Sequence, residues 1–265
     1  MSELEKIKKV AICAAKEAGE ILRSHFGKIK HVEQKIGAGI VTEADKKAEK
    51  KIISMVKTSF PHHAILAEES GIYEKKSASY KWIIDPLDGT TNFVHQLPLF
   101  CVSIGVEREG EIVLSVILNP LTQDIFTAEK GKGAFCNKKR ISVSPCSKIE
   151  DALFITGFSY QSGMMVQEEL LRLEPFLQKT RGIRRSGSAV WDFYQVAQGH
   201  FDGFWEKHLS PWDVAAGLLL VQEAGGKVSR YDGSPATAYD HEILASNGIL
   251  HEKIVDLLMT KRSKL

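Results

Sequence analysis

Apolar residues recur at steps of three and four near the start of the chain, the spacing of one face of an α-helix. These positions are Leu4, Ile7, Ala11, Ala14, Ala18 and Ile21. Ser2 and Glu5 have the capping-box spacing that begins a helix, and Gly27 follows the last apolar position, as is common just beyond a helix end. The pattern therefore predicts a long N-terminal helix that packs on the core through one face.

Short apolar runs further along the chain predict strands, and two of them end in acidic residues. Residues 63–67 precede Glu68 and Glu69, and residues 80–84 precede Asp85 and a proline. Beyond a change in composition near residues 142–147, predicted strands and helices alternate. Helices interleaved with mixed sheets favour a layered α/β or α+β fold.

Composition and charge narrow the class of protein. The 265 residues are 43% hydrophobic and 26% charged, which is typical of a globular protein, and the formal net charge is only +2. So small a charge gives no strong field for binding nucleic acid or an anionic membrane. The longest apolar run, residues 214–221, is far shorter than the ~20 residues that span a bilayer. Four cysteines without CxxC spacing and the lack of a signal-peptide pattern predict reduced thiols and a cytoplasmic location.

The segment 85–92, Asp-Pro-Leu-Asp-Gly-Thr-Thr-Asn, is the first candidate for chemistry. Pro86 fixes a turn, and Gly89 lets the backbone approach a ligand closely. Thr90 would begin a helical turn whose free N–H groups can hold phosphate. Asp85 and Asp88 beside such a cradle would bring a metal and a phosphate together. The alternative is an Asp-Pro turn in which Asp88 caps a helix.

Two further acidic positions have structural explanations of their own. Glu68 and Glu69 suit a polar turn, and Asp213 suits the first turn of a helix that begins after Ser210. Only their combination with the first segment makes them candidate ligands. Oxygen ligands without His or Cys nearby favour Mg²⁺ or Mn²⁺ over zinc. A phosphate at such a site implies hydrolysis by water that the metal activates.

Taken together, these motifs resemble the inositol monophosphatase family. The matching motifs are the acidic segment 67–69, the signature 82–93, the segment 212–217 with 223–226, and Gly187-Ser188-Ala189 with Glu206. The order and spacing agree over nearly the whole chain. The resemblance implies a layered α-β-α-β-α sandwich, of the type shared with fructose-1,6-bisphosphatase. An α+β half, 1–143, would carry most metal ligands, and an α/β half, 144–265, would carry Asp213 and the substrate contacts.

The resemblance also implies a metal site of two or three Mg²⁺ ions per subunit, with Mn²⁺ as an alternative. Glu68, Asp85 and the Leu87 carbonyl would hold the first ion. Asp85, Asp88 and Asp213 would hold the second, and a looser third ion would bind near Glu68. Two ions about 3.5–4 Å apart can stabilise both ends of an in-line displacement.

Catalytic and phosphate-binding roles follow from the same resemblance. Thr90, with Glu68, would orient the attacking water, and Asp45 would support Thr90. For Asp45 the alternative is a helix cap. The backbone N–H groups of Gly89 and Thr90 would hold phosphate oxygens.

Substrate contacts are expected from the second half of the chain. Gly187, Ser188, Ala189 and Glu206 fall where the family contacts the sugar. Arg185, with Arg184, would reach a second phosphate or a subunit interface, although two arginines on a solvated loop are the simpler explanation.

The expected activity is hydrolysis of inositol monophosphate to inositol and phosphate in a cytoplasmic homodimer that lithium inhibits. One alternative is a dual inositol monophosphatase and fructose-1,6-bisphosphatase, for which some microbial members of the family are known. An alternative of another class is a partner of RNA polymerase in transcription antitermination. The partners expected are therefore a small phosphate ester and a second subunit, with no direct nucleic-acid or membrane contact.

Overall fold

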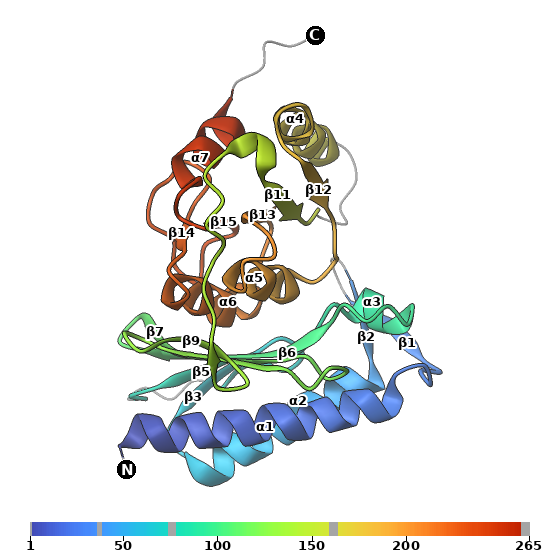
Figure 1. Cartoon of the computed structure of the whole chain (residues 1–265). Coiled ribbons are helices and arrows are strands. Elements are labelled where there is room, and N and C mark those ends of the chain that lie inside the picture. Colours follow the sequence, from blue (N-terminus) through green and yellow to red (C-terminus); the bar gives the residue numbers. More distant parts are fainter. Residues whose placement is uncertain (1, 36–38, 74–77, 159–163, 261–265) are drawn as a thin grey trace.

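Helices and sheets alternate in five layers in the computed structural model, which describes residues 2–35, 39–73, 78–158 and 164–260 (Figure 1). From one side to the other these layers are a pair of helices (α1, α2), an eight-stranded sheet, a second pair (α5, α6), a five-stranded sheet and a third pair (α4, α7). This arrangement confirms the predicted α-β-α-β-α sandwich.

The helices of at least five residues are α1 (Glu3–His25), α2 (Glu43–Ser59), α3 (Thr90–Val94), α4 (Met164–Lys179), α5 (Ala189–Ala197), α6 (Pro211–Glu223) and α7 (His251–Met259). The eight-stranded sheet has the order β10 (Lys139–Arg140), β9 (Gly133–Cys136), β8 (Ile125–Glu129), β7 (Glu111–Leu118), β6 (Cys101–Arg108), β5 (Lys81–Asp88), β3 (Ala64–Ala67), β4 (Gly71–Tyr73). The five-stranded sheet has the order β12 (Gly182–Arg184), β11 (Leu153–Thr156), β13 (Gly203–Lys207), β15 (Glu242–Ser246), β14 (Lys227–Ser229). A separate hairpin pairs β1 (Val32–Gln34) with β2 (Ile40–Thr42).

The predicted N-terminal helix is confirmed with its capping box, in which the Glu5 amide donates to Ser2 Oγ and the Ser2 amide donates to the Glu5 carboxylate. The short strands β1 and β4 were not predicted. Every residue of β1 is exposed, so this strand has no apolar alternation that a sequence could reveal.

The prediction of a turn at Asp85-Pro86 was wrong. Strand β5 runs through the proline to Asp88, with an irregular register between Asp85, opposite Ser103, and Asp88, opposite Cys101. Pairing with β6 on both sides of the proline keeps the segment in the sheet, because a bulge tolerates the missing N–H. Asp85 and Asp88 therefore stand on one rigid strand end.

Hydrogen bonds attach the helices of the middle layer, and the segment that leads into them, to the eight-stranded sheet and α3. The Glu223 carboxylate at the end of α6 accepts from the amides of Gly131 and Gly133, both at 2.7 Å, in the β8–β9 hairpin. At the other end of the layer, Asn92 Nδ2 donates to the Ser186 carbonyl at 3.0 Å. Residues of both sheets can thus contribute to one fixed site. No helix in the described part of the chain is long and apolar enough to span a bilayer.

Candidate active site

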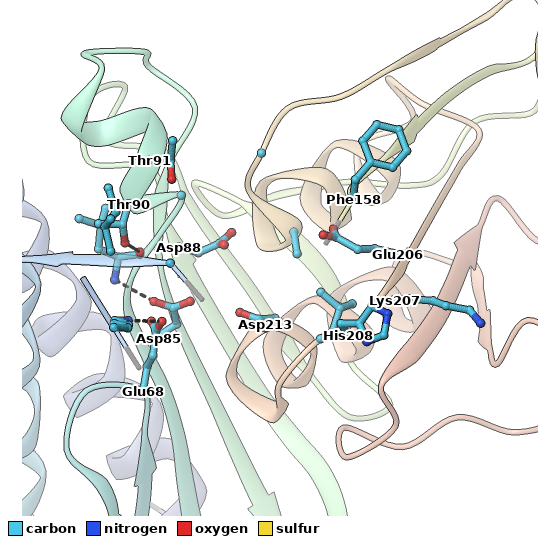
Figure 2. A pocket seen from close by; sticks show the side chains of 18 of the residues that line it. Glu68, Asp85, Asp88, Thr90, Thr91, Phe158, Glu206, Lys207, His208 and Asp213 are labelled. Carbon is cyan, nitrogen blue, oxygen red and sulfur yellow. Dashed lines mark hydrogen bonds and ion pairs between the residues drawn. The ribbon is translucent and has the colours of Figure 1, made fainter. Parts of the chain in front are cut away.

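A pocket of about 250 Å³ opens where the end of β5 faces the start of α6 and the end of β13 (Figure 2). Acidic side chains line it from both sides: Asp85 and Asp88 come from the eight-stranded sheet, and Asp213 and Glu206 come from the other half. The pocket is also lined by Glu68, Leu87, Gly89, Thr90, Arg185, Gly187 and Ala189. Of the predicted site residues, only Asp45 and Ser188 do not line the pocket.

Three carboxylates form the centre of the site. Asp85, Asp88 and Asp213 each offer an oxygen within 4.8 Å of the other two. Burial is the largest cause that raises the pKa of all three, and the neighbouring carboxylates raise them further; the pKa of Asp88 rises to about 6. Three like charges so close are costly unless a cation shares them, and the donors are all hard oxygens. The cluster therefore fits a divalent cation of the Mg²⁺ type.

Backbone N–H groups fix two of these aspartates. The Ser210 amide donates to Asp213 Oδ2 at 2.8 Å, because Asp213 is the third residue of a capped helix. The Leu87 amide donates to Asp85 Oδ1 at 2.9 Å. The first-turn explanation for Asp213 is thus correct. The same carboxylate can also serve as a ligand, because the Ser210 amide engages only one of its two oxygens.

Asp88 is held from the opposite half of the molecule. Its Oδ2 accepts from Ser188 Oγ at 2.5 Å and from the Val190 amide at 2.7 Å, both at the start of α5. Cys101 Sγ lies 3.8 Å from the same oxygen. Ser188 is buried, and its hydroxyl is occupied by Asp88. This side chain therefore positions Asp88. The Ser188 amide donates to Ser186 Oγ, and the Ser188 carbonyl accepts from the Asp192 amide, so the backbone of Ser188 is also engaged within the protein.

Asp45 connects the helix α2 to Thr90. Its Oδ2 accepts from the amide and the hydroxyl of Thr42, which caps α2, and its Oδ1 accepts from Thr90 Oγ1 at 3.0 Å. Asp45 is therefore not the cap of α2, which is Thr42, but the third residue of its capping box, and it also contacts Thr90. Its support of Thr90 in catalysis stays a prediction. Thr90 Oγ1 also lies 3.1 Å from the Leu87 carbonyl. The Thr90 hydroxyl is thus held at the pocket wall by two acceptors.

Lys35 is a site residue that the sequence did not reveal. Its ammonium donates to Glu68 Oε1 and to Glu69 Oε1, each at 2.6 Å. Burial and the Glu68 charge raise the pKa of Glu69 to about 7, and Lys35 opposes this rise. The buried Glu49 accepts from the Glu69 amide at 2.8 Å. Lys35 follows a strand with no apolar pattern, so nothing in the sequence marks it.

The opposite wall presents Glu206, whose carboxyl has a pKa raised to about 8 by burial and by the Asp88 charge. Ala189 and Gly187 lie beside it at the start of α5, and Arg185 is exposed at the mouth. Phe158 and His208 also line this wall and were not predicted (Figure 2). This half of the pocket thus combines an acid, a cation and an aromatic ring.

The five-layer fold and the cluster of carboxylates define a layered α/β protein with a group of acidic side chains that fits a divalent metal. The model of the inositol monophosphatase family matches residues 3–263, and the chain belongs to this family.

Relatives agree with this assignment. An inositol-1-monophosphatase of Synechocystis is 41% identical over 258 residues, which are 97% of this chain and 90% of the relative. A protein of Pseudomonas aeruginosa named Nus factor SuhB is 41% identical over 244 residues, 90% of each chain.

Solved structures give the same result. The extragenic suppressor protein SuhB of Bartonella henselae has a TM-score of 0.93 and 39% identity, covering 97% of this chain and all of that one. An IMPase/NADP phosphatase complexed with Mg²⁺ and phosphate has a TM-score of 0.86 and 26% identity, covering 98% of this chain and 97% of that one.

Proposed function

We propose that this protein hydrolyses inositol monophosphate to inositol and phosphate with Mg²⁺. The observation that carries the proposal is the cluster of Asp85, Asp88 and Asp213, which faces Glu206 across one pocket. One wall suits a metal with phosphate, and the other suits the hydroxyls of a polyol. The family and the relative named inositol-1-monophosphatase support this substrate.

Asp85, Asp88 and Asp213 would hold one ion, and Glu68, Asp85 and the Leu87 carbonyl would hold another. When bound, Mg²⁺ neutralises phosphate charge and lowers the pKa of a coordinated water. We propose two or three Mg²⁺ per subunit, with Mn²⁺ as a substitute and lithium as an inhibitor that competes for one of these positions. The structural neighbour that is complexed with Mg²⁺ and phosphate, the IMPase/NADP phosphatase, supports this choice of metal.

The chain's own side chains would orient the reactants. A Thr90 hydroxyl that donates to Asp45 keeps a lone pair to accept a hydrogen bond from the attacking water, with Glu68 as the second acceptor for that water. The backbone N–H groups of Gly89 and Thr90, at the start of α3, would donate to phosphate oxygens. Glu206 and the Ala189 backbone would bind ring hydroxyls, with Gly187 and Ser188 beside them in the substrate-binding segment.

The test is phosphate release from inositol 1-phosphate and fructose 1,6-bisphosphate, measured side by side across a Mg²⁺ titration. We expect activity that requires Mg²⁺ and a strong preference for the inositol ester. An Asp88→Asn variant should be folded and nearly inactive. Retained activity in this variant would contradict the metal assignment, and a lack of activity on both esters would contradict the proposed substrate class.

A dual activity that includes fructose 1,6-bisphosphate is a second candidate, because Arg185 lines the pocket mouth where a second phosphate would lie. Arg185→Ala would then raise KM for the bisphosphate at least tenfold and leave KM for inositol 1-phosphate within about twofold. Equal effects on both esters would remove this candidate.

We further propose a cytoplasmic homodimer, built from halves that divide between residues 143 and 144, and a small phosphate ester as the main partner. The relative named Nus factor SuhB favours one additional candidate, an association with RNA polymerase in antitermination. Copurification of RNA polymerase with the tagged protein tests it, and comparison with Asp88→Asn shows whether the association depends on the phosphatase site.

A further inference from the structure

Gly157 lies where the carboxylate of Glu206 leaves no room for a side chain. Gly157 follows the last residue of β11, and Glu206 stands in the neighbouring strand β13. A methyl group on Gly157 would lie 2.1 Å from Cδ, Oε1 and Oε2 of Glu206. Real carbon atoms do not approach this closely, so the carboxyl group occupies the space that any side chain at position 157 would need.

The backbone does not explain why this residue is glycine. Gly157 is not one of the glycines with positive φ, so its conformation is open to alanine. The three atoms nearest to a methyl group there all belong to the Glu206 carboxyl. The Glu206 carboxyl is therefore what excludes a larger residue.

The two strand ends cannot move apart to relieve such a contact. Strands β11 and β13 are paired in parallel, with Thr156 opposite Trp205. Thr156 Oγ1 also donates to the Trp205 carbonyl at 2.6 Å, and both residues are fully buried. A methyl group at position 157 would therefore displace the flexible carboxyl and leave the strands in place. Glu206 lines the pocket, so displacing its carboxyl would change the shape of the pocket on this wall.

We propose that Gly157 is a specificity-determining residue that positions Glu206: by leaving room for the carboxyl against β11, it sets the width of the polyol half of the pocket. The inference rests on the proposed function, since it takes Glu206 as the acceptor for substrate hydroxyls. Gly157 should not affect the phosphate half of the pocket, which is formed by residues 85–90.

The experiment compares wild type, Gly157→Ala, Glu206→Asp and the double variant on inositol 1-phosphate and on p-nitrophenyl phosphate, which has no polyol hydroxyls. In Gly157→Ala we expect KM for inositol 1-phosphate to rise about tenfold, the effect of one lost hydrogen bond, with kcat within about threefold. KM for p-nitrophenyl phosphate and the Ki of inorganic phosphate should stay within about twofold. In the Glu206→Asp background the shorter side chain frees the space, so Gly157→Ala should add less than about a twofold change.

Each outcome decides the proposal. Equal increases of KM in both backgrounds, or equal effects on both substrates, would overturn it. If Gly157→Ala fails to fold, recovery of the thermal transition by Glu206→Asp supports the steric argument, and no recovery overturns it. A crystal structure of Gly157→Ala should show the Glu206 carboxyl displaced by more than about 1 Å, and an unmoved carboxyl refutes the inference. If wild type shows no preference for inositol 1-phosphate, the proposed function fails. The crystal structure of Gly157→Ala still tests in that case whether Gly157 positions Glu206.

Discussion

Asp88→Asn should stabilise the metal-free protein while it removes the activity. Asp88 is buried, and burial raises its pKa from 3.8 to about 6, with a further contribution from the Glu68 charge and against the hydrogen bonds from Ser188 and the Val190 amide. Asparagine keeps an oxygen that can accept from Ser188 and from the Val190 amide. Its amide nitrogen would replace the oxygen that faces Asp85 and Asp213, and it can donate to them.

The magnitude follows from the pKa. Each unit corresponds to about 1.4 kcal/mol, so the raised pKa costs the ionised wild type about 3 kcal/mol. The pKa of about 6 already includes the hydrogen bonds from Ser188 and the Val190 amide, which favour the carboxylate. The net gain of Asp88→Asn is therefore about 3 kcal/mol, which raises Tm by roughly 6–12 °C in a chain of this size.

The gain should depend on pH with a definite sign. Below pH 4 the aspartate is protonated in both the folded and the unfolded chain, so wild type and Asp88→Asn differ little in stability. As pH rises from about 4 to about 6, the unfolded chain ionises first and wild-type stability falls relative to the variant. Above pH 6 we expect the full difference in stability between Asp88→Asn and wild type.

The assay is thermal unfolding of both proteins in EDTA between pH 4 and pH 8, repeated with Mg²⁺. Mg²⁺ should raise the Tm of wild type much more than that of the variant. Asp202→Asn is a matched control, since Asp202 is buried, accepts from the Leu153 amide at 2.7 Å and does not line the pocket. It should lower Tm and leave the Mg²⁺ response intact. A variant Asp88→Asn that is less stable than wild type at pH 8 in EDTA would refute the reasoning.

Three further predictions test other contacts. Asp45→Asn should lower kcat at least tenfold and shift Tm by only a few degrees, because the amide turns a donor toward Thr90; unchanged kcat would contradict the role of Asp45. Lys35→Gln should lower the Tm of the metal-free protein increasingly as pH rises above 7, because Glu69 then ionises without its counter-charge. Thermal unfolding over a series of pH values tests this, and a Tm difference from wild type that does not depend on pH would contradict the ion pair's role. Glu223→Ala should cost about 1–3 kcal/mol in denaturant unfolding without changing kcat, since it leaves two hairpin N–H groups without their acceptor; a large loss of kcat would show that this contact also shapes the site.

Much of the fold could be predicted from patterns of residues close together in the sequence. The spacing of apolar residues and the capping box at Ser2 predicted α1, and the acidic ends of apolar runs pointed to Asp85, Asp88 and Glu68. Such features depend on neighbours within a few residues, so a single sequence displays them. The continuation of β5 through Pro86 was not predicted, because pairing with β6 overrides the local preference for a turn.

The sequence by itself determined which residue types are available: hard oxygen donors on a strand end, a glycine that lets a ligand approach, and a capped helix that carries Asp213. Only the tertiary structure decided which side chains these residues contact. It turned one oxygen of Asp88 toward Ser188, joined Asp45 to Thr90, brought Lys35 to Glu68, and left Gly157 without space beside Glu206. These pairs lie 33 to 100 residues apart in the chain, so packing, and no local rule, sets their contacts.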